Sequence, residues 1–214
     1  MALEATHMRF AFDLKDKYQV KDLQKYISGS IYPDSRYLSK IDRVLTHPKD
    51  RMEWDIANLD DFKKGWHSHL ICDRIQLQLI MESKPEIFVG EIRHGDQAWL
   101  YSTAIKALQE IDIVKSFDVV SYLPCLNYIE TPNGEDANTL REYNQIFIRE
   151  YADPKSFGTK NIDRIGRTFG MNDEVVDQIS RHVLLNQQDP DVLRLLKNIY
   201  NQMLNRALNL NIWP

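Results

Sequence analysis

Residues 65–83 read GWHSHLICDRIQLQLIMES, and their large side chains recur at helical spacing. One series steps by three or four positions through Trp66, Leu70, Asp73, Leu77 and Ile80. Side chains at these intervals leave the same face of an α-helix. The stretch therefore predicts a helix that buries this face in a core, with one carboxylate set among the apolar residues.

The same spacing recurs in longer stretches at residues 97–113, 138–152 and 190–210. Shorter helical patterns cover residues 22–27 and 175–185. The chain has only 8 glycines and 8 prolines, which are too few to separate many short strands. We therefore expect an all-α fold in a single domain that spans residues 1–214.

Three helix starts are predicted by polar residues that precede these patterns. They are Asn138–Thr139, Asn172 and Asp189–Pro190. Side chains of Asn, Asp and Thr accept hydrogen bonds from the free N–H groups of a first turn, and Pro favours its first position.

Composition and charge narrow the classes of function. The chain has 27 basic and 31 acidic residues and a formal net charge of −4, which argues against binding long nucleic acid. Cys72 and Cys125 are single and far apart, so neither a zinc ribbon nor a disulfide framework is expected. No apolar run approaches the length of a membrane span and the start lacks a signal-peptide pattern, so we expect a cytoplasmic protein.

Polar residues with metal-binding chemistry concentrate between residues 7 and 73. His69 and Asp73 are four positions apart, so their side chains can share one divalent ion on one helix face. Asp34 lies in a Tyr-Pro-Asp-Ser turn and could instead form an Asx-turn or a helix cap. His47 precedes a proline and could instead cap a helix end, and His7 could be only a polar residue beside an apolar run.

The order of these residues resembles zinc-dependent phospholipase C and related bacterial phosphohydrolase-like proteins, which are all-α. That family has an early histidine, an aspartate after a proline, a downstream histidine, and a helix with His-xxx-Asp after a glycine. The resemblance covers residues 1 to about 75 of the 214. It implies five metal ligands, namely His7, Asp34, His47, His69 and Asp73.

The family's second ligand set, two histidines and a glutamate, is missing from residues 74–85. Glu91 and His94 could supply part of a second site if they share a helix face, but Gly90 and Gly95 are equally consistent with a loop. A related all-α family, the HD-domain phosphohydrolases, is defined by an adjacent His-Asp pair, and the sequence has none. Residues 96–214 are expected to form a helical remainder.

Imidazole and carboxylate ligands without thiolates suit zinc first, with iron or manganese as alternatives. With one position open, such an ion polarises phosphoryl oxygens and makes a bound water more acidic. Asp34 and Asp73 are the predicted catalytic carboxylates, and Arg36 is the predicted phosphate partner. Lys40, Arg43 and Arg74 are nearby cations that could equally be ordinary surface residues.

The expected function is hydrolysis of a small-molecule or lipid-derived phosphate ester with a divalent metal. Two alternatives stay open: a helical binding or scaffold protein without catalysis, and an HD-type nucleotide phosphohydrolase. Serine-nucleophile, P-loop and dinucleotide-binding motifs are absent from the sequence. The sequence leaves the oligomeric state open.

Overall fold

The computed structural model describes residues 3–48 and 54–210, and within these ranges it contains ten α-helices and no β-strand. The predicted all-α class is confirmed. No helix in these ranges combines the length and apolarity that crossing a bilayer requires, in agreement with the expectation of no membrane span.

The α-helices are α1 (Glu4–Leu14), α2 (Leu23–Ile31), α3 (Arg36–Ser39), α4 (Arg43–Thr46), α5 (Asp61–Ser83), α6 (Gln97–Ser116), α7 (Ala137–Glu150), α8 (Thr159–Thr168), α9 (Asp173–Asn186) and α10 (Pro190–Leu208). Short 3₁₀ helices connect them, namely η1 (Tyr32–Ser35), η3 (Ile56–Asn58), η4 (Pro85–Ile87) and η5 (Val119–Asn127).

Side-chain caps set where several of these helices begin. The carboxylate of Asp189 accepts from the backbone of Asp191 and Val192, and Asn172 caps α9 in the same way. These two predicted starts are confirmed. The start predicted at Asn138–Thr139 is wrong by two residues, because Asp136 is the residue whose side chain accepts from the Thr139 N–H.

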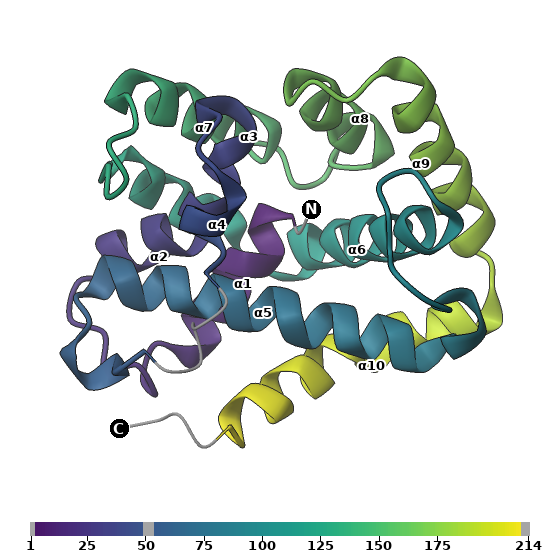
Figure 1. The fold of residues 1–214 in the computed structure, drawn as a ribbon, viewed down its shortest axis with the longest axis horizontal. Helices are drawn as coiled ribbons and strands as arrows, with labels where there is room; N and C mark the ends of the chain where they lie inside the picture. Colours follow the sequence, from purple (N-terminus) through teal and green to yellow (C-terminus); the bar gives the residue numbers. More distant parts are fainter. Residues whose placement is uncertain (1–2, 49–53, 211–214) are drawn as a thin grey trace.

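Helix α5 runs across the whole molecule, and α1, α2 and α10 pack against it (Figure 1). Helix α1 is central: it contacts α2, α5, α6 and α10. Five of its apolar residues have no exposed surface, namely Ala5, Met8, Phe10, Ala11 and Leu14, while Arg9, Phe12 and Asp13 reach the surface. The buried sides of such a helix can carry polar side chains only where they meet other polar groups, which makes its buried histidine notable.

The crossing of α2 and α5 is unusually close because glycine occupies both helices at the contact. A Cβ atom at Gly29 would lie 2.0 Å from the carbonyl oxygen of Phe62, and one at Gly65 would lie 1.9 Å from that of Tyr26. Only glycine permits this approach of two backbones. The crossing brings the end of α2 and the start of η1 beside the turn of α5 that follows Gly65.

Candidate metal centre

The five histidine and aspartate side chains from residues 7 to 73 lie together, although they come from four different elements. His7 is on α1, Asp34 is in η1, His47 follows α4, and His69 and Asp73 are one turn apart on α5. One ligand atom from each of His7, Asp34 and His69 lies within 4.8 Å of the others. The same holds for His47, His69 and Asp73, so His69 belongs to both groups.

The gaps between these ligand atoms are too wide for hydrogen bonds and close to the spacing around one ion. The Nε2 atoms of His7, His47 and His69 each lie 3.7 Å from a carboxylate oxygen of Asp73. His47 Nε2 is also 3.9 Å from Asp34 Oδ1. Hydrogen bonds of this type measure roughly 2.7–3.2 Å. Two ligands bound tetrahedrally to one zinc ion at about 2.1 Å would be separated by about 3.4 Å.

Two of the imidazoles have their orientation set by a hydrogen bond at the far nitrogen. Nδ1 of His69 lies 2.9 Å from the carbonyl oxygen of Ser30, which can only accept, so His69 donates from Nδ1. Nδ1 of His47 lies 3.0 Å from the hydroxyl oxygen of Thr46. In neutral His69 the lone pair is therefore on Nε2, which faces the cluster. Metal-ligating histidines are commonly held in this way.

Several buried polar atoms of the cluster have no hydrogen-bond partner among residues 3–48 and 54–210. They are both ring nitrogens of His7, Nε2 of His69, Oδ2 of Asp34 and Oδ1 of Asp73. The rings of His7 and His69 are stacked, with centroids 3.8 Å apart. An unsatisfied buried polar group costs about 1–3 kcal/mol, so such a concentration is unfavourable unless another group completes it. A cation would satisfy one nitrogen of His7, Nε2 of His69 and the carboxylate oxygens.

The charge states match a cation site. Burial, together with the neighbouring His69, lowers the pKa of His7 well below its ordinary value, and burial also lowers the pKa of His69. Burial alone would raise the pKa of Asp73, but His47 and Lys106 hold that pKa well below its usual range. The neutral imidazoles of His7 and His69 therefore lie beside an ionised carboxylate, and these are donors that divalent zinc, iron or manganese prefers.

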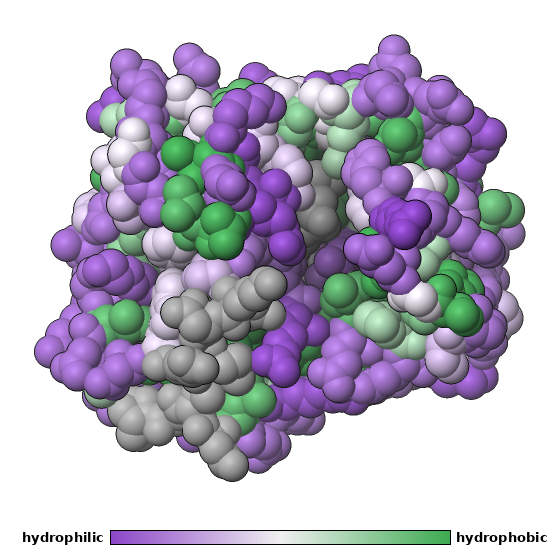
Figure 2. All heavy atoms as spheres, viewed as in Figure 1, coloured by the Kyte–Doolittle hydropathy of each residue, from purple (hydrophilic) through white to green (hydrophobic). Residues whose placement is uncertain are grey.

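The cluster opens to solvent through Asp73. Side-chain exposure is 0% for His7 and His69, 4% for Asp34 and 7% for His47, but it is 25% for Asp73. Asp73 lines a cavity of about 530 Å³ between α4, α5, α6 and the loop that joins α5 to α6. Figure 2 shows a hollow on this face, with apolar side chains on both of its sides within a mostly hydrophilic surface.

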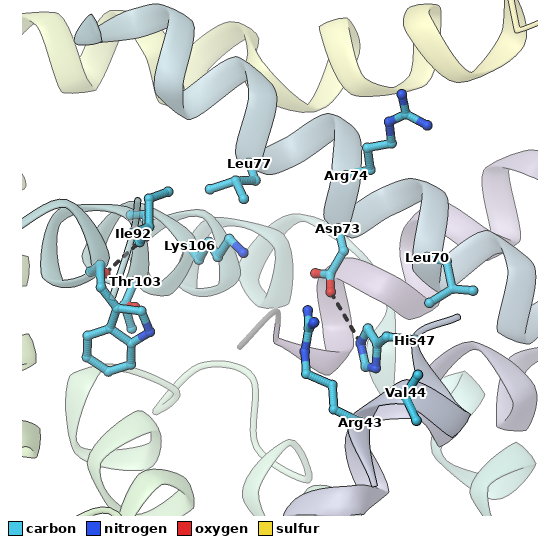
Figure 3. A pocket seen from close by; sticks show the side chains of 12 residues that line it. Arg43, Val44, His47, Leu70, Asp73, Arg74, Leu77, Ile92, Thr103 and Lys106 are labelled. Atoms are coloured by element: carbon cyan, nitrogen blue, oxygen red, sulfur yellow. Dashed lines mark hydrogen bonds and ion pairs between the residues drawn. The ribbon is translucent and has the colours of Figure 1, made fainter. Parts of the chain in front are cut away.

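Two cations face Asp73 across this cavity. Figure 3 shows Arg43 of α4 and Lys106 of α6 extending toward the Asp73 carboxylate, while Arg74 points away from it along the other side of α5. Lys106 did not emerge as a candidate from the sequence. Its only signal is a lysine inside the apolar run TAIKALQEI at residues 103–111.

Arg36, the predicted phosphate partner, lies elsewhere. Its guanidinium donates to the hydroxyl oxygen of Tyr37 at 2.7 Å and lies over the ring of Tyr37, and Arg36 does not line the cavity beside Asp73. The catalytic role of Arg36 stays a prediction. The cations that line the cavity beside Asp73, where a phosphate partner was expected, are Arg43 and Lys106.

The residues considered for a second metal site lie apart from the cluster. Glu91 and His94 are exposed in the loop before α6, not on a helix. Glu91 lies 3.4 Å from the guanidinium of Arg93, and the ring of His94 packs on Trp99 at 4.3 Å between centroids. Of the residues that the structure describes, no group of metal-binding side chains includes Glu91 or His94.

Comparison with known protein-family models, with curated proteins and with solved structures found no match for this chain.

Proposed function

We propose that the protein is a divalent-metal-dependent hydrolase of small or lipid-derived phosphate esters. One observation carries this proposal. Five candidate ligand side chains converge, four of them with unsatisfied buried atoms, and their most exposed member, Asp73, borders a cavity that Arg43 and Lys106 also line. A cation site joined to an anion-binding cavity is the arrangement that phosphoryl transfer to water requires.

The residues that would hold the metal are His7, Asp34, His47, His69 and Asp73. A bound divalent ion, with zinc favoured over iron or manganese, would act as a Lewis acid on a phosphoryl oxygen and make a bound water more acidic. Imidazole nitrogens and carboxylate oxygens are ligands that suit such an ion. The all-α fold and the order of the five residues support a phospholipase C-like architecture for the chain.

The role of each residue at the site would follow from how deeply its side chain is buried. Asp34 and His7 are enclosed, so they would hold the ion and exclude water from that side. Asp73 stays ionised and borders the cavity, so its charge sets how strongly the ion attracts a phosphoryl oxygen. Arg43 and Lys106 would neutralise the remaining negative charge of the ester from the opposite side.

A metal-binding scaffold without catalysis is the second candidate. The observation that favours it is the position of Glu91 and His94, which are exposed in a loop and leave the phospholipase C-like second ligand set unmatched. In this alternative the ion would only stabilise the fold, and the cavity beside Asp73 would bind no substrate.

A hydrolysis assay with metal-loaded protein separates the two candidates. The protein is loaded with zinc or manganese, its metal content is measured, and release of alcohol or phosphate is followed from nitrophenyl phosphate, bis(nitrophenyl) phosphate, a nucleoside monophosphate and a short-chain phosphatidylcholine. We expect hydrolysis of at least one ester, lost in Asp73→Asn and kept in the exposed control Asp112→Asn. Full metal loading with no hydrolysis of any ester would favour the scaffold.

A further inference from the structure

One side of α6 lines the cavity. Trp99, Ser102, Thr103 and Lys106 all line it, and they are spaced three, four and seven positions from the first residue. These intervals place them on one helix face. The face lies opposite Asp73 of α5, so the two helices form facing walls of the same cavity.

Lys106 is the unusual member of this face. The residue as a whole is only 8% exposed, but its amine is not among the enclosed atoms and borders the cavity. Within the described part of the chain the ammonium group has neither a hydrogen bond nor an ion pair, so its donors are free to bind a group that enters the cavity. Figure 3 shows the amine directed into the cavity toward Asp73. A cation with free donors at the wall of a cavity can bind an anion there.

Arg43 supplies a second positive charge on the same side of the cavity. Its side chain extends toward Asp73, and its guanidinium has no ion pair among the residues that the structure describes (Figure 3). A bound divalent ion would balance the two negative charges of Asp34 and Asp73. The positive charges of Arg43 and Lys106 would then be left over, and they would match an anion with two negative charges.

The opposite end of the cavity is apolar. Leu77 of α5, Ile92 of the loop and the indole of Trp99 line it. The volume of about 530 Å³ is within the roughly 300–1,000 Å³ of small-molecule sites, so it holds more than a phosphate group. An apolar or flat organic group fits this end, because it would remove the exposed side of these residues from water.

We propose that the cavity binds phosphate monoesters, with the dianionic phosphoryl group between Lys106 and Arg43 and an apolar organic group against Trp99. This inference rests on the proposed function for its metal ion, and it narrows the substrate class from phosphate esters in general to monoesters. A diester carries one negative charge fewer and leaves one of the two cations without a counter-charge.

The test measures binding, not turnover. Metal-loaded protein is titrated by calorimetry at pH 8 with naphthylmethylphosphonate, a dianion that cannot be hydrolysed, with methylphosphonate, and with the monoethyl ester of naphthylmethylphosphonate. The variants are Lys106→Met, which keeps the length of the side chain, Arg43→Gln, Trp99→Ala, and the control Arg74→Gln, which removes a cation that also borders the cavity but points away from Asp73.

We expect naphthylmethylphosphonate to bind at least tenfold more tightly than either its monoethyl ester or methylphosphonate. Lys106→Met and Arg43→Gln should each weaken this binding at least tenfold, and Arg74→Gln should change it less than twofold. Trp99→Ala should remove the preference for the naphthyl group over methyl. Circular dichroism and metal content verify each variant, and if Lys106→Met fails to fold or to hold metal, the exposed Arg43→Gln decides the matter.

Equal binding of the dianion and its monoester, unchanged binding in Lys106→Met or Arg43→Gln, or no binding by the parent protein would overturn the inference. Hydrolysis is measured in a separate experiment, so that a failure of this inference can be distinguished from a failure of the proposed function. Protein that binds the phosphonate through Lys106 but cleaves no ester supports this inference and contradicts the proposed function. Lys106→Met protein that cleaves esters as fast as the parent supports the proposed function and contradicts this inference.

Discussion

Nδ1 of His69 donates a hydrogen bond to the carbonyl oxygen of Ser30 at 2.9 Å, and this contact joins two helices at the candidate metal centre. Ser30 is on α2 and His69 is on α5, and the two helices cross at Gly29 and Gly65. The backbone of one helix therefore orients the ring of a ligand on the other. The geometry of the centre therefore depends on the crossing of α2 and α5, although neither of the two glycines at this crossing is a ligand.

Gly65→Ala tests this dependence. The added Cβ would lie 1.9 Å from the carbonyl oxygen of Tyr26, which is backbone and cannot move aside without separating α2 from α5. Overpacking of this kind costs about 1–3 kcal/mol and sometimes more, so we expect a loss of at least 2 kcal/mol in the free energy of unfolding. Urea denaturation measures the loss. The control is Gly158→Ala, where a Cβ meets no atom within 4 Å and the change should stay below about 1 kcal/mol. Similar values for the two variants would contradict the close-crossing account.

Thr46→Val tests the hydrogen bond at the far nitrogen of His47. Thr46 is fully buried and Val has nearly the same shape, so the change removes the hydroxyl that lies 3.0 Å from Nδ1 of His47. Loss of such an orienting partner weakens metal binding by about 10–100-fold. Competition with a chelating dye measures the zinc affinity, and Thr46→Ser, which keeps the hydroxyl, should remain close to the parent. Equal affinities in all three proteins would show that the hydroxyl does not orient His47.

Asp73→Asn and His69→Ala both remove a ligand, but we expect them to fail differently. His69→Ala takes away the residue shared by the two ligand groups, so metal occupancy should fall most strongly there. Asp73→Asn keeps the side-chain shape and cancels one negative charge at the border of the cavity. Saturating metal should then restore occupancy but not the rate of ester hydrolysis, because the lost charge changes the electrophilicity of the ion.

Hydrolysis and metal content measured across a zinc titration distinguish these outcomes. A rate in Asp73→Asn that recovers together with occupancy would assign to Asp73 a role in holding the ion only.

Glu4→Gln tests a buried carboxyl beside the centre. Burial raises the pKa of Glu4 well above its ordinary value of 4.5, and the carboxylates of Asp34 and Glu110 raise it further. A carboxyl whose pKa is higher in the folded than in the unfolded protein contributes stability at pH values below the pKa of the unfolded chain. This contribution is lost as the pH rises through the pKa of the folded protein. Gln removes the titration and keeps an oxygen for the hydroxyl of Tyr143.

The free energy of unfolding of Glu4→Gln relative to the parent should therefore increase steadily as the pH is raised from 5 to 8. Urea denaturation in the presence of a chelator measures this difference without metal effects. The exposed Glu142→Gln serves as the control, with a difference that does not change over this range. A difference for Glu4→Gln that is independent of pH would contradict the raised pKa.

Amphipathic spacing explains which helices could be predicted. The helical patterns at residues 65–83, 97–113 and 190–210 correspond to α5, α6 and α10, each of which has large apolar side chains at helical spacing. Helix α1 was not predicted, because most of its residues are buried and only Arg9, Phe12 and Asp13 leave a narrow strip at the surface. Helix α8 and the 3₁₀ helix η5 were also not predicted.

The candidate centre was only partly accessible to reasoning from the residues. The pair His69 and Asp73 follows directly from helical spacing, since four positions bring two side chains to one face. His7 and Asp34 could be assigned as ligands only from the resemblance to a family, because their closeness to His69 depends on how α1 and α2 pack against α5. Lys106 was missed for the same reason: the packing of α6 against α5 decides what its ammonium faces.

Metal content is the most direct test of the central claim that His7, Asp34, His47, His69 and Asp73 form a metal centre. Protein is incubated with zinc, freed of unbound metal by dialysis, and analysed for zinc per chain beside the double variant His69→Ala/Asp73→Asn. We predict at least about one tightly held zinc per parent chain, with nitrogen and oxygen neighbours at roughly 2.0–2.2 Å by X-ray absorption, and almost none in the variant. Parent protein that is folded but retains no more zinc than the double variant would contradict the claim.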